Sequence, residues 1–282
     1  MKNKVIFFVL MMMTISSKSQ NKENIFSVNT GDYMVHLLSE GQQTGNTSIL
    51  IGATPEMIKE QIPDGAFPNA TNAFLIQASG KNILVDTGFG RLLSDNLKEL
   101  GLRNESIDAI LLTHMHGDHI GGLLKNGQIV FPDIRLYISK PEYDYWLNVN
   151  NESALNILKA YKNQIVLFDP NELENITNEL LPGISAIAVY GHTPGHTAYL
   201  IQSGDNKLLI WGDLTHAMAI QMPYPQIAVT YDVDPESAIR SREAILKYVS
   251  ENKIPVAGMH IAYPAIGDVR LFLEGRYEFV PR

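Results

Sequence analysis

The sequence contains no cysteine among its 282 residues. This absence excludes disulfide bonds, thiolate ligands and a lipid anchor attached through cysteine. Long apolar runs are also missing, because no segment after residue 20 approaches the roughly 18 consecutive apolar residues that a membrane-spanning helix needs. We therefore expect a soluble mature protein that is stabilised without covalent cross-links.

Positive charge is scarce, and part of it lies in a segment that we expect to be removed. Residues 1–4 are basic, residues 5–15 form an apolar run of eleven, and residues 16–20 are mostly small and polar, a pattern typical of a secretory signal peptide. An N-terminal membrane anchor is the alternative, but eleven apolar residues are too few to span a bilayer. We predict a signal peptide over residues 1–19, cleaved near Ser19 or Gln20, and export to the periplasm or the medium.

The charge of the mature chain limits its partners. The full chain has 22 Lys and Arg against 30 Asp and Glu, a formal net charge of −8, and loss of the three lysines in residues 1–19 makes it −11. A chain this acidic is a poor partner for nucleic acid or for an anionic membrane. We therefore predict a small-molecule substrate.

The remainder, residues 20–282, shows no repeats and no low-complexity linker. Short β-rich runs alternate with amphipathic helical patterns throughout, which predicts one α/β domain of two similar halves. We expect strands over 33–38, 73–77, 82–88, 107–114, 134–139, 184–192, 197–203, 207–213 and 254–260. We expect helices over 94–102, two within 141–162, and the clearest over 235–252.

Four of the expected strands end in a side chain that can bind metal. They end in His114, His192, Asp213 and His260. A rigid sheet fixes such side chains while the loops beyond it leave access. One histidine in such a place is more often a hydrogen-bonded structural residue, but four such strand ends favour a common site.

The segment THMHGDH, residues 113–119, adds three histidines and an aspartate within seven positions. Alternate residues of an extended chain share a face, so His114 and His116 can bind one ion. Asp118 and His119 follow Gly117, where the chain can turn, and can reach a second ion. A histidine-rich turn without metal is the alternative, but unpaired buried polar groups are costly.

Imidazole and carboxylate ligands suit Zn²⁺, and also Mn²⁺, Fe²⁺ and Co²⁺. Each ion needs more than two ligands. His192 can complete the first set and His260 the second, while Asp213 can bridge the two ions. We therefore predict two divalent ions per chain, with Zn²⁺ favoured.

These motifs resemble those of the metallo-β-lactamase superfamily. The resemblance rests on THMHGDH, GHTPGHT (191–197), WGD (211–213), GMH (258–260) and VDTG (85–88), and it covers about residues 70–282. It implies a four-layer αββα sandwich with a dinuclear site at one edge of the sheets. It also implies the ligands of one metal (His114, His116, His192), those of the other (Asp118, His119, His260) and the bridge (Asp213).

The motif GHTPGHT contains two histidines, so the ligand must be chosen. The family's bridging aspartate usually lies a little over twenty residues after the ligand histidine; Asp213 lies 21 residues after His192 and 17 after His196. We therefore choose His192. We expect His196 and Asp86 to orient ligands through hydrogen bonds, with turn stabilisation as the alternative for His196. His36 carries no signal and is expected at the surface.

Two divalent ions that share a water lower its pKa and supply a hydroxide nucleophile. Asp118 is the expected catalytic carboxylate, which orients the water or accepts its proton. The chemistry predicted is hydrolysis of an ester, lactone, amide or phosphoester.

Two branches of the superfamily fit best: N-acyl-homoserine lactone lactonases, which act in quorum quenching, and exported organophosphorus hydrolases of the methyl-parathion type. KLLIWGDLTH and GMHIAYPAIGDVR resemble the second branch closely. Lactonases often carry a tyrosine three residues after the bridging aspartate; here His216 stands there, and either donates a similar hydrogen bond or only packs. We predict lactone or carboxylic-ester hydrolysis, with phosphotriester hydrolysis second and a metal-containing binding module without turnover third.

We expect an apolar pocket for a substrate with an apolar portion. The candidates for its lining are Phe67, Phe89, Met115, Tyr143, Trp146, Met218, Met222 and Tyr224. The alternative is that most of them belong to the core, and for any one of them singly we favour the core. The resemblance also allows a homodimer.

Overall fold

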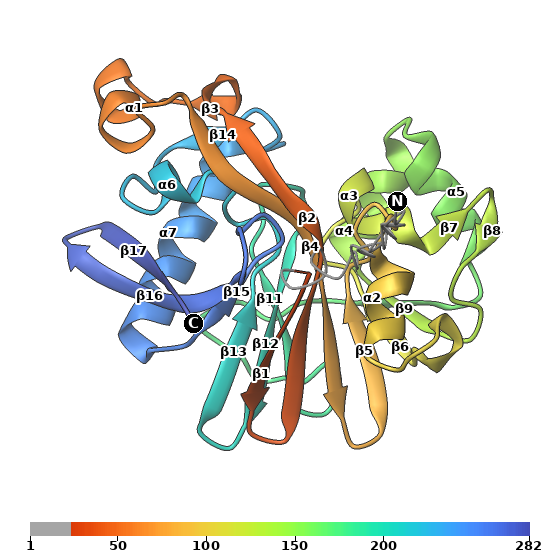
Figure 1. The fold of residues 1–282 in the computed structure, drawn as a ribbon. Helices are drawn as coiled ribbons and strands as arrows, with labels where there is room; N and C mark the ends of the chain where they lie inside the picture. The colour runs from red at the N-terminus through yellow and green to blue at the C-terminus, as the bar shows by residue number, and fades with distance from the viewer. Residues whose placement is uncertain (1–23) are drawn as a thin grey trace, which may run out of the picture.

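The structure is a computed structural model, and it describes residues 24–282. The predicted signal peptide, residues 1–19, lies outside the described residues. Within residues 24–282, no helix is long and apolar enough to cross a membrane. Figure 1 shows two central sheets with helices on the outer side of each.

The first sheet has seven strands, in an order that mixes hairpins with parallel neighbours. The order is β1 (Ile25–Thr30), β2 (Tyr33–Asn46), β4 (Ala66–Ala78), β5 (Lys81–Val85), β6 (Ala109–Leu111), β9 (Arg135–Ser139) and β10 (Ile165–Phe168). Strands β5, β6, β9 and β10 are parallel to their neighbours in that series. The antiparallel pair β2–β4 shifts register between Ser39 and Gln42 and then continues to Asn46.

The second sheet has six strands. The order is β11 (Ile184–Ala188), β12 (Thr197–Ser203), β13 (Asn206–Ile210), β15 (Val256–Ala257), β16 (Ile266–Leu273) and β17 (Arg276–Pro281). Two small pairs complete the strands: β3 (Leu50–Ile51) with β14 (Ala228–Val229), and β7 (Leu124–Lys125) with β8 (Gln128–Ile129).

The helices are α1 (Pro55–Gln61), α2 (Leu93–Glu99), α3 (Gly117–Ile120), α4 (Lys140–Asn148), α5 (Glu152–Ala160), α6 (Met218–Gln221) and α7 (Pro235–Asn252). Helices α1, α5 and α7 begin with a side-chain cap. The Asn151 side chain accepts a hydrogen bond from the Ala154 backbone N–H at the start of α5. Asp234 caps α7 in the same way through Ser237, and Pro235 occupies the first helical position.

Residues along β2 and β4 alternate between the two hydrophobic layers, as the period of a strand requires. Leu37 and Phe74 face the second sheet, where Tyr199 and Trp211 also pack. The neighbouring residues Leu38 and Leu75 face the opposite way, with residues of α2, α4 and α5. This double packing confirms the predicted αββα sandwich.

The sequence located most strands and helices correctly, but it placed several strand ends too late. The strand expected over 107–114 ends at Leu111, so the histidine segment lies in the loop beyond it. Among the strands of the two main sheets, β1, β10, β16 and β17 were not predicted. The expectation for His36 was wrong: it is 7% exposed on β2 and lies 2.7 Å from Ser27 Oγ and 2.9 Å from Gln77 Oε1.

Candidate metal centre

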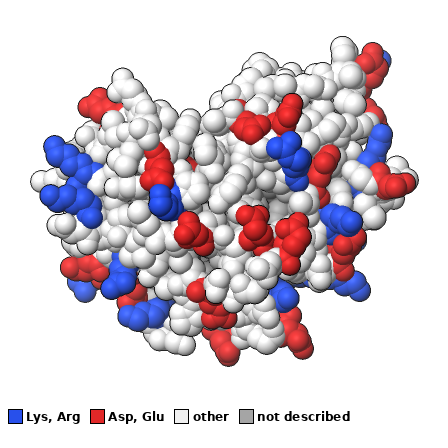
Figure 2. All heavy atoms as spheres, turned by 180° about the vertical axis from the view of Figure 1, so that it is seen from behind, with Lys and Arg blue, Asp and Glu red and all other residues white. Residues whose placement is uncertain are grey.

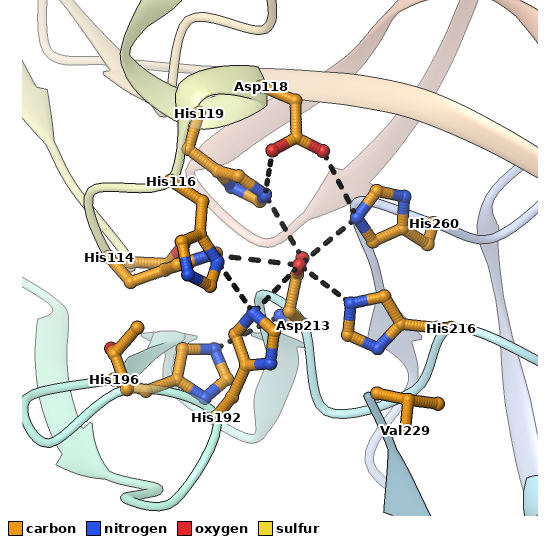
Figure 3. A network of polar contacts seen from close by, with 12 residues as sticks. His114, His116, Asp118, His119, His192, His196, Asp213, His216, Val229 and His260 are labelled. Atoms are coloured by element: carbon orange, nitrogen blue, oxygen red, sulfur yellow. Dashed lines mark hydrogen bonds and ion pairs between the residues drawn. The ribbon is translucent and has the colours of Figure 1, made fainter. Parts of the chain in front are cut away.

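The predicted site residues follow strands that end at a common edge. Strands β5 and β6 are parallel in the first sheet, and β13 and β15 are parallel in the second. Strand β11 runs in the direction of β13, because each is antiparallel to β12. The loops after these strands carry all the histidines and carboxylates of the centre (Figure 3).

The histidine segment combines an extended stretch with one helical turn. His116 is extended, with φ −66° and ψ 157°, and it directly precedes α3. Helix α3 then holds Asp118 and His119 on a tight turn that begins at Gly117. The segment therefore presents two pairs of side chains in different directions, as its spacing predicted.

Three imidazoles form the first group of potential ligands. His116 Nδ1 lies 3.0 Å from His114 Nε2 and 3.0 Å from His192 Nε2. The Nδ1–H of His114 faces Thr113 Oγ1 at 3.1 Å, and that of His192 donates to Asp232 Oδ1 at 2.9 Å. The Nδ1–H of each ring is thus paired on the outer side, and the Nε2 atoms of His114 and His192 face the centre.

The second group consists of Asp118, His119 and His260. The His119 Nε2 atom lies 3.7 Å from Asp118 Oδ1, and the His260 Nε2 atom lies 3.4 Å from Asp118 Oδ2. The opposite ring nitrogen of each histidine is occupied, since His119 donates to Asp86 Oδ2 at 2.7 Å and His260 donates to the Ala70 carbonyl at 2.9 Å.

Asp213 lies between the two groups. Its Oδ1 is 3.2 Å from His119 Nε2, while its Oδ2 is 3.3 Å from His192 Nε2 and 3.0 Å from His260 Nε2. The same Oδ2 is 3.0 Å from His216 Nε2. One carboxylate therefore faces both groups, as the predicted bridge requires, and His216 joins the cluster beside it (Figure 3).

Buried partners hold the potential ligands in place from behind. Asp86, in a left-handed conformation with φ 60°, accepts hydrogen bonds from the Thr113 backbone N–H (2.8 Å), Thr113 Oγ1 (2.6 Å) and His119. His196 lies behind Asp213 and accepts the Asp213 backbone N–H at Nε2, 3.0 Å away. The expected hydrogen bonds of Asp86 and His196 are therefore present, and the first group contains His192 rather than His196.

Sequence reasoning missed Asp232 and Glu142. Asp232 fixes the tautomer of His192, and its Oδ2 accepts the Val229 backbone N–H at 3.0 Å. Glu142 on α4 is buried and accepts hydrogen bonds from two of the site loops. Neither residue belongs to a recognisable motif; a carboxylate within an otherwise apolar helix face was the one available signal for Glu142.

The side chains present fit divalent metal ions. Four groups of three residues have ligand atoms within 4.8 Å of one another. Within the described residues, His119 Nε2 and Asp213 Oδ1 are buried without a hydrogen-bond partner, which is costly unless an ion contacts both atoms. Imidazole nitrogens and carboxylate oxygens are the ligands that Zn²⁺ prefers.

The charges around the centre support the same conclusion. Burial lowers the pKa of His116 to about 3, which favours a neutral, ligating imidazole. Burial opposes charge on His192, but its hydrogen bonds to Asp213 and Asp232 outweigh this and raise its pKa to about 9. Burial also opposes ionisation of Asp213, yet the surrounding histidines hold its pKa well below the usual range. The buried carboxylates therefore attract positive charge.

A cavity of about 420 Å³ opens above the centre. Its polar wall comes from the far end of the β2–β4 hairpin, with Gln43, Thr44, Asn69 and Thr71. Its apolar lining consists of Ile49, Phe89 and Tyr231. Asp118, Asp213 and His216 are among the residues at its floor.

Of the eight residues considered for the apolar lining, Phe89 borders the cavity, and the alternative of a place in the core is confirmed for most of the others. Phe67, Met115, Trp146, Met222 and Tyr224 are buried in the interior, and Tyr143 and Met218 pack against it. Met115 shows the physical reason: it alternates with His114 and His116, so its side chain turns away from the centre and into the core.

Comparison with known proteins agrees with this geometry. Residues 66–253 match the family described as the Metallo-beta-lactamase superfamily. The match covers well over half of the chain, so the chain belongs to this superfamily of metal-dependent hydrolases.

Two solved structures are similar over almost the whole chain. One is described as AidC, a dizinc quorum-quenching lactonase in complex with a product; it is 26% identical, with a TM-score of 0.83, over 92% of this chain and 98% of that one. The other is the hydrolase AbOPH, 24% identical, with a TM-score of 0.83, over 93% of this chain and 99% of that one. The second likeness concerns the fold alone.

Curated relatives match over shorter regions. Ribonuclease TTHA0252 of Thermus thermophilus is 27% identical over 61% of this chain, and the N-acyl homoserine lactonase of Bacillus cereus is 29% identical over 40% of this chain. The chain spans 42% of the ribonuclease and 40% of the lactonase, less than half of each.

Proposed function

We propose that the protein is a two-metal hydrolase that opens lactones or other carboxylic esters, with N-acyl-homoserine lactones as the favoured substrates. The observation that carries this proposal is the shared position of Asp213. It faces two groups of three ligands at the floor of a cavity, whereas a structural zinc site normally surrounds one ion with four protein ligands.

The metal ions would be held by His114, His116 and His192 on one side and by Asp118, His119 and His260 on the other, with Asp213 between them. Bound there, two divalent ions supply a water of lowered pKa and polarise the carbonyl oxygen under attack. Asp118 is partly exposed, with 23% of its side chain accessible, and lines the cavity. It is therefore placed to accept a proton from the attacking water and to return it to the leaving oxygen.

His216 also lies at the floor of the cavity. Its ring stacks on His260, with centroids 4.7 Å apart, and lies 5.7 Å from the ring of Tyr231 at the cavity wall. Its Nδ1 is buried, so Nε2, which lies 3.0 Å from Asp213 Oδ2, is the ring nitrogen that can donate a hydrogen bond to a substrate carbonyl oxygen. We assign it the role of a substrate-contacting residue.

The cavity suits a small neutral molecule with a polar head and an apolar tail. Amide and hydroxyl side chains on the β2–β4 wall can pair with an acyl amide, and Ile49 and Phe89 provide apolar surface. Figure 2 shows Lys and Arg interspersed with Asp and Glu on the face it presents, rather than gathered in a basic patch. These features support a small-molecule substrate, as does the product bound to the structural neighbour AidC.

Phosphotriester hydrolysis is the second candidate. It is favoured by the presence of His216 where lactonases often carry a tyrosine, and it requires the same attack on a polarised neutral centre. A metal-containing binding module without turnover is a candidate of another class.

A direct assay separates the three candidates. We expect metal-replete protein to hydrolyse N-hexanoyl-homoserine lactone, followed with a pH indicator, at a higher kcat/KM than a chromogenic phosphotriester. Chelation should abolish turnover, and Zn²⁺ or Mn²⁺ should restore it. A higher kcat/KM for the phosphotriester would reverse the order of the first two candidates, and full metal occupancy without any turnover would favour the binding module.

Export is a separate part of the proposal. It rests on the sequence pattern of residues 1–19. Expression of the full chain in a bacterium should yield a shortened product outside the cytoplasm, and an unshortened product in the cytoplasm would contradict it.

A further inference from the structure

Helix α4 contributes one fully enclosed carboxylate to the region behind the metal centre. Glu142 is 1% exposed, although it lies in the first turn of a surface helix. A buried carboxylate is costly unless hydrogen bonds compensate for the lost water. Its four partners lie 2.6–3.0 Å away, and each of them is a donor.

The two oxygens of Glu142 serve two different loops. Oε1 accepts the Met115 backbone N–H at 2.9 Å and the Trp146 indole N–H at 2.6 Å. Oε2 accepts the Thr193 hydroxyl at 2.6 Å and the Gly195 backbone N–H at 3.0 Å. A single carboxylate therefore connects the loop after β6 with the loop after β11.

Three of these four contacts lie next to an imidazole of the first group. Met115 stands between His114 and His116, and Thr193 directly follows His192. The Trp146 ring meets the His116 ring edge-on, with centroids 5.6 Å apart. The second group has other supports, since His119 is held by Asp86 and His260 by a backbone carbonyl.

The packing of α4 on the loop after β11 leaves no room for adjustment. A Cβ at Gly195 would lie 2.1 Å from the Glu142 backbone nitrogen and 2.5 Å from its Cα. The Ser139 hydroxyl, at the start of α4, also donates to the Gly195 carbonyl at 2.7 Å. The helix start, the carboxylate and the loop thus form one rigid contact.

We propose that Glu142 is a positioning residue that sets the spacing of His114, His116 and His192, and so controls the affinity of one metal ion of the pair. The proposal rests on the two-ion site proposed above. Partners of metal ligands typically contribute about 10- to 100-fold to metal affinity. Because the residues that Glu142 contacts flank His114, His116 and His192, whereas His119 and His260 have other supports, its loss should weaken the binding of one ion and spare the other.

The test is a zinc titration of metal-free protein against a chromogenic chelator, for the wild type and for Glu142→Gln. The wild type should bind two ions. The variant keeps the shape of the side chain but places an amide N–H₂ against hydrogen-bond donors. It should bind one ion as the wild type does and the other about 10- to 100-fold more weakly.

The control is Asp144→Asn, which changes an exposed carboxylate two residues along α4 to the matching amide. This variant should bind both ions as the wild type does.

A folded Glu142→Gln protein that binds both ions normally, or that loses affinity equally for both, would overturn the proposal. Should Glu142→Gln fail to fold by circular dichroism, Thr193→Val removes one of the four hydrogen bonds. This substitution should lower the affinity for the same ion by about tenfold, and unchanged binding would again overturn the proposal. A wild type that binds fewer than two ions would instead overturn the two-ion site itself.

Discussion

The ligand cluster and the cavity wall above it are built in different ways. The cluster is buried: His114, His119 and Asp213 are at most 3% exposed, and hydrogen bonds fix them from behind. The wall consists of the far end of the β2–β4 hairpin and of loops, and its apolar members Phe89 and Tyr231 are 41% and 53% exposed. The comparison suggests that the chemistry is fixed by buried charge, whereas substrate selection depends on exposed, replaceable side chains.

The largest effect is expected at the centre of the cluster. Asp213→Ala removes the carboxylate that faces both ligand groups. We expect at least one metal ion to be lost and kcat/KM to fall by about 10³-fold, since metal polarisation contributes several kcal/mol to the transition state. Metal analysis and lactone kinetics measure both effects, and near-normal activity would remove Asp213 from the site.

A smaller effect is expected at the residues that hydrogen-bond to the potential ligands and do not face the ions themselves. Asp232→Ala frees the Nδ1–H of His192, so the ring can rotate or change tautomer. Metal affinity should fall by about 10- to 100-fold. Asp205→Asn, at an exposed turn between β12 and β13, is the control and should bind metal normally. Equal affinities in the two variants would show that orientation of His192 does not depend on Asp232.

Substitutions in the cavity wall should change KM rather than kcat. Phe89→Ala removes apolar contact surface at the cavity entrance without touching a ligand. We expect about 1–2 kcal/mol of lost substrate binding, which corresponds to about a 5- to 30-fold higher KM for an acyl lactone. Leu147→Ala, an equally exposed apolar residue on α4, should leave KM unchanged. A fall in kcat with constant KM at Phe89 would contradict the division between cluster and wall.

The smallest effect is expected at the start of helix α5, on the stability of the fold. Asn151→Ala removes the side chain that accepts the Ala154 N–H at the start of α5. The free energy of unfolding should fall by about 1 kcal/mol, measured by urea denaturation. Zinc affinity should not change; a weakened metal site would show that this helix start supports the cluster.

The same contrast explains what could be predicted from the sequence. His114, His192, Asp213 and His260 follow strongly apolar strands, so their convergence could be predicted from local patterns. The cavity wall could not, because it depends on a register shift between Ser39 and Gln42 and on how far the β2–β4 pair extends past the neighbouring strands β1 and β5.

Asp232 and Glu142 escaped prediction for a related reason. Asp232 lies 40 residues from His192 in the chain, and Glu142 lies 27 residues from Met115. Tertiary packing alone brings these pairs together. Local sequence thus reveals the ligands, while the residues that position them appear only in the folded chain.

The central claim is that two ions bind on either side of Asp213. Anomalous diffraction from crystals grown with Zn²⁺ tests it most directly. We predict two peaks in each chain, one among His114, His116 and His192 and the other among Asp118, His119 and His260, both in contact with Asp213. A single peak, or two peaks of which neither contacts Asp213, would contradict the account.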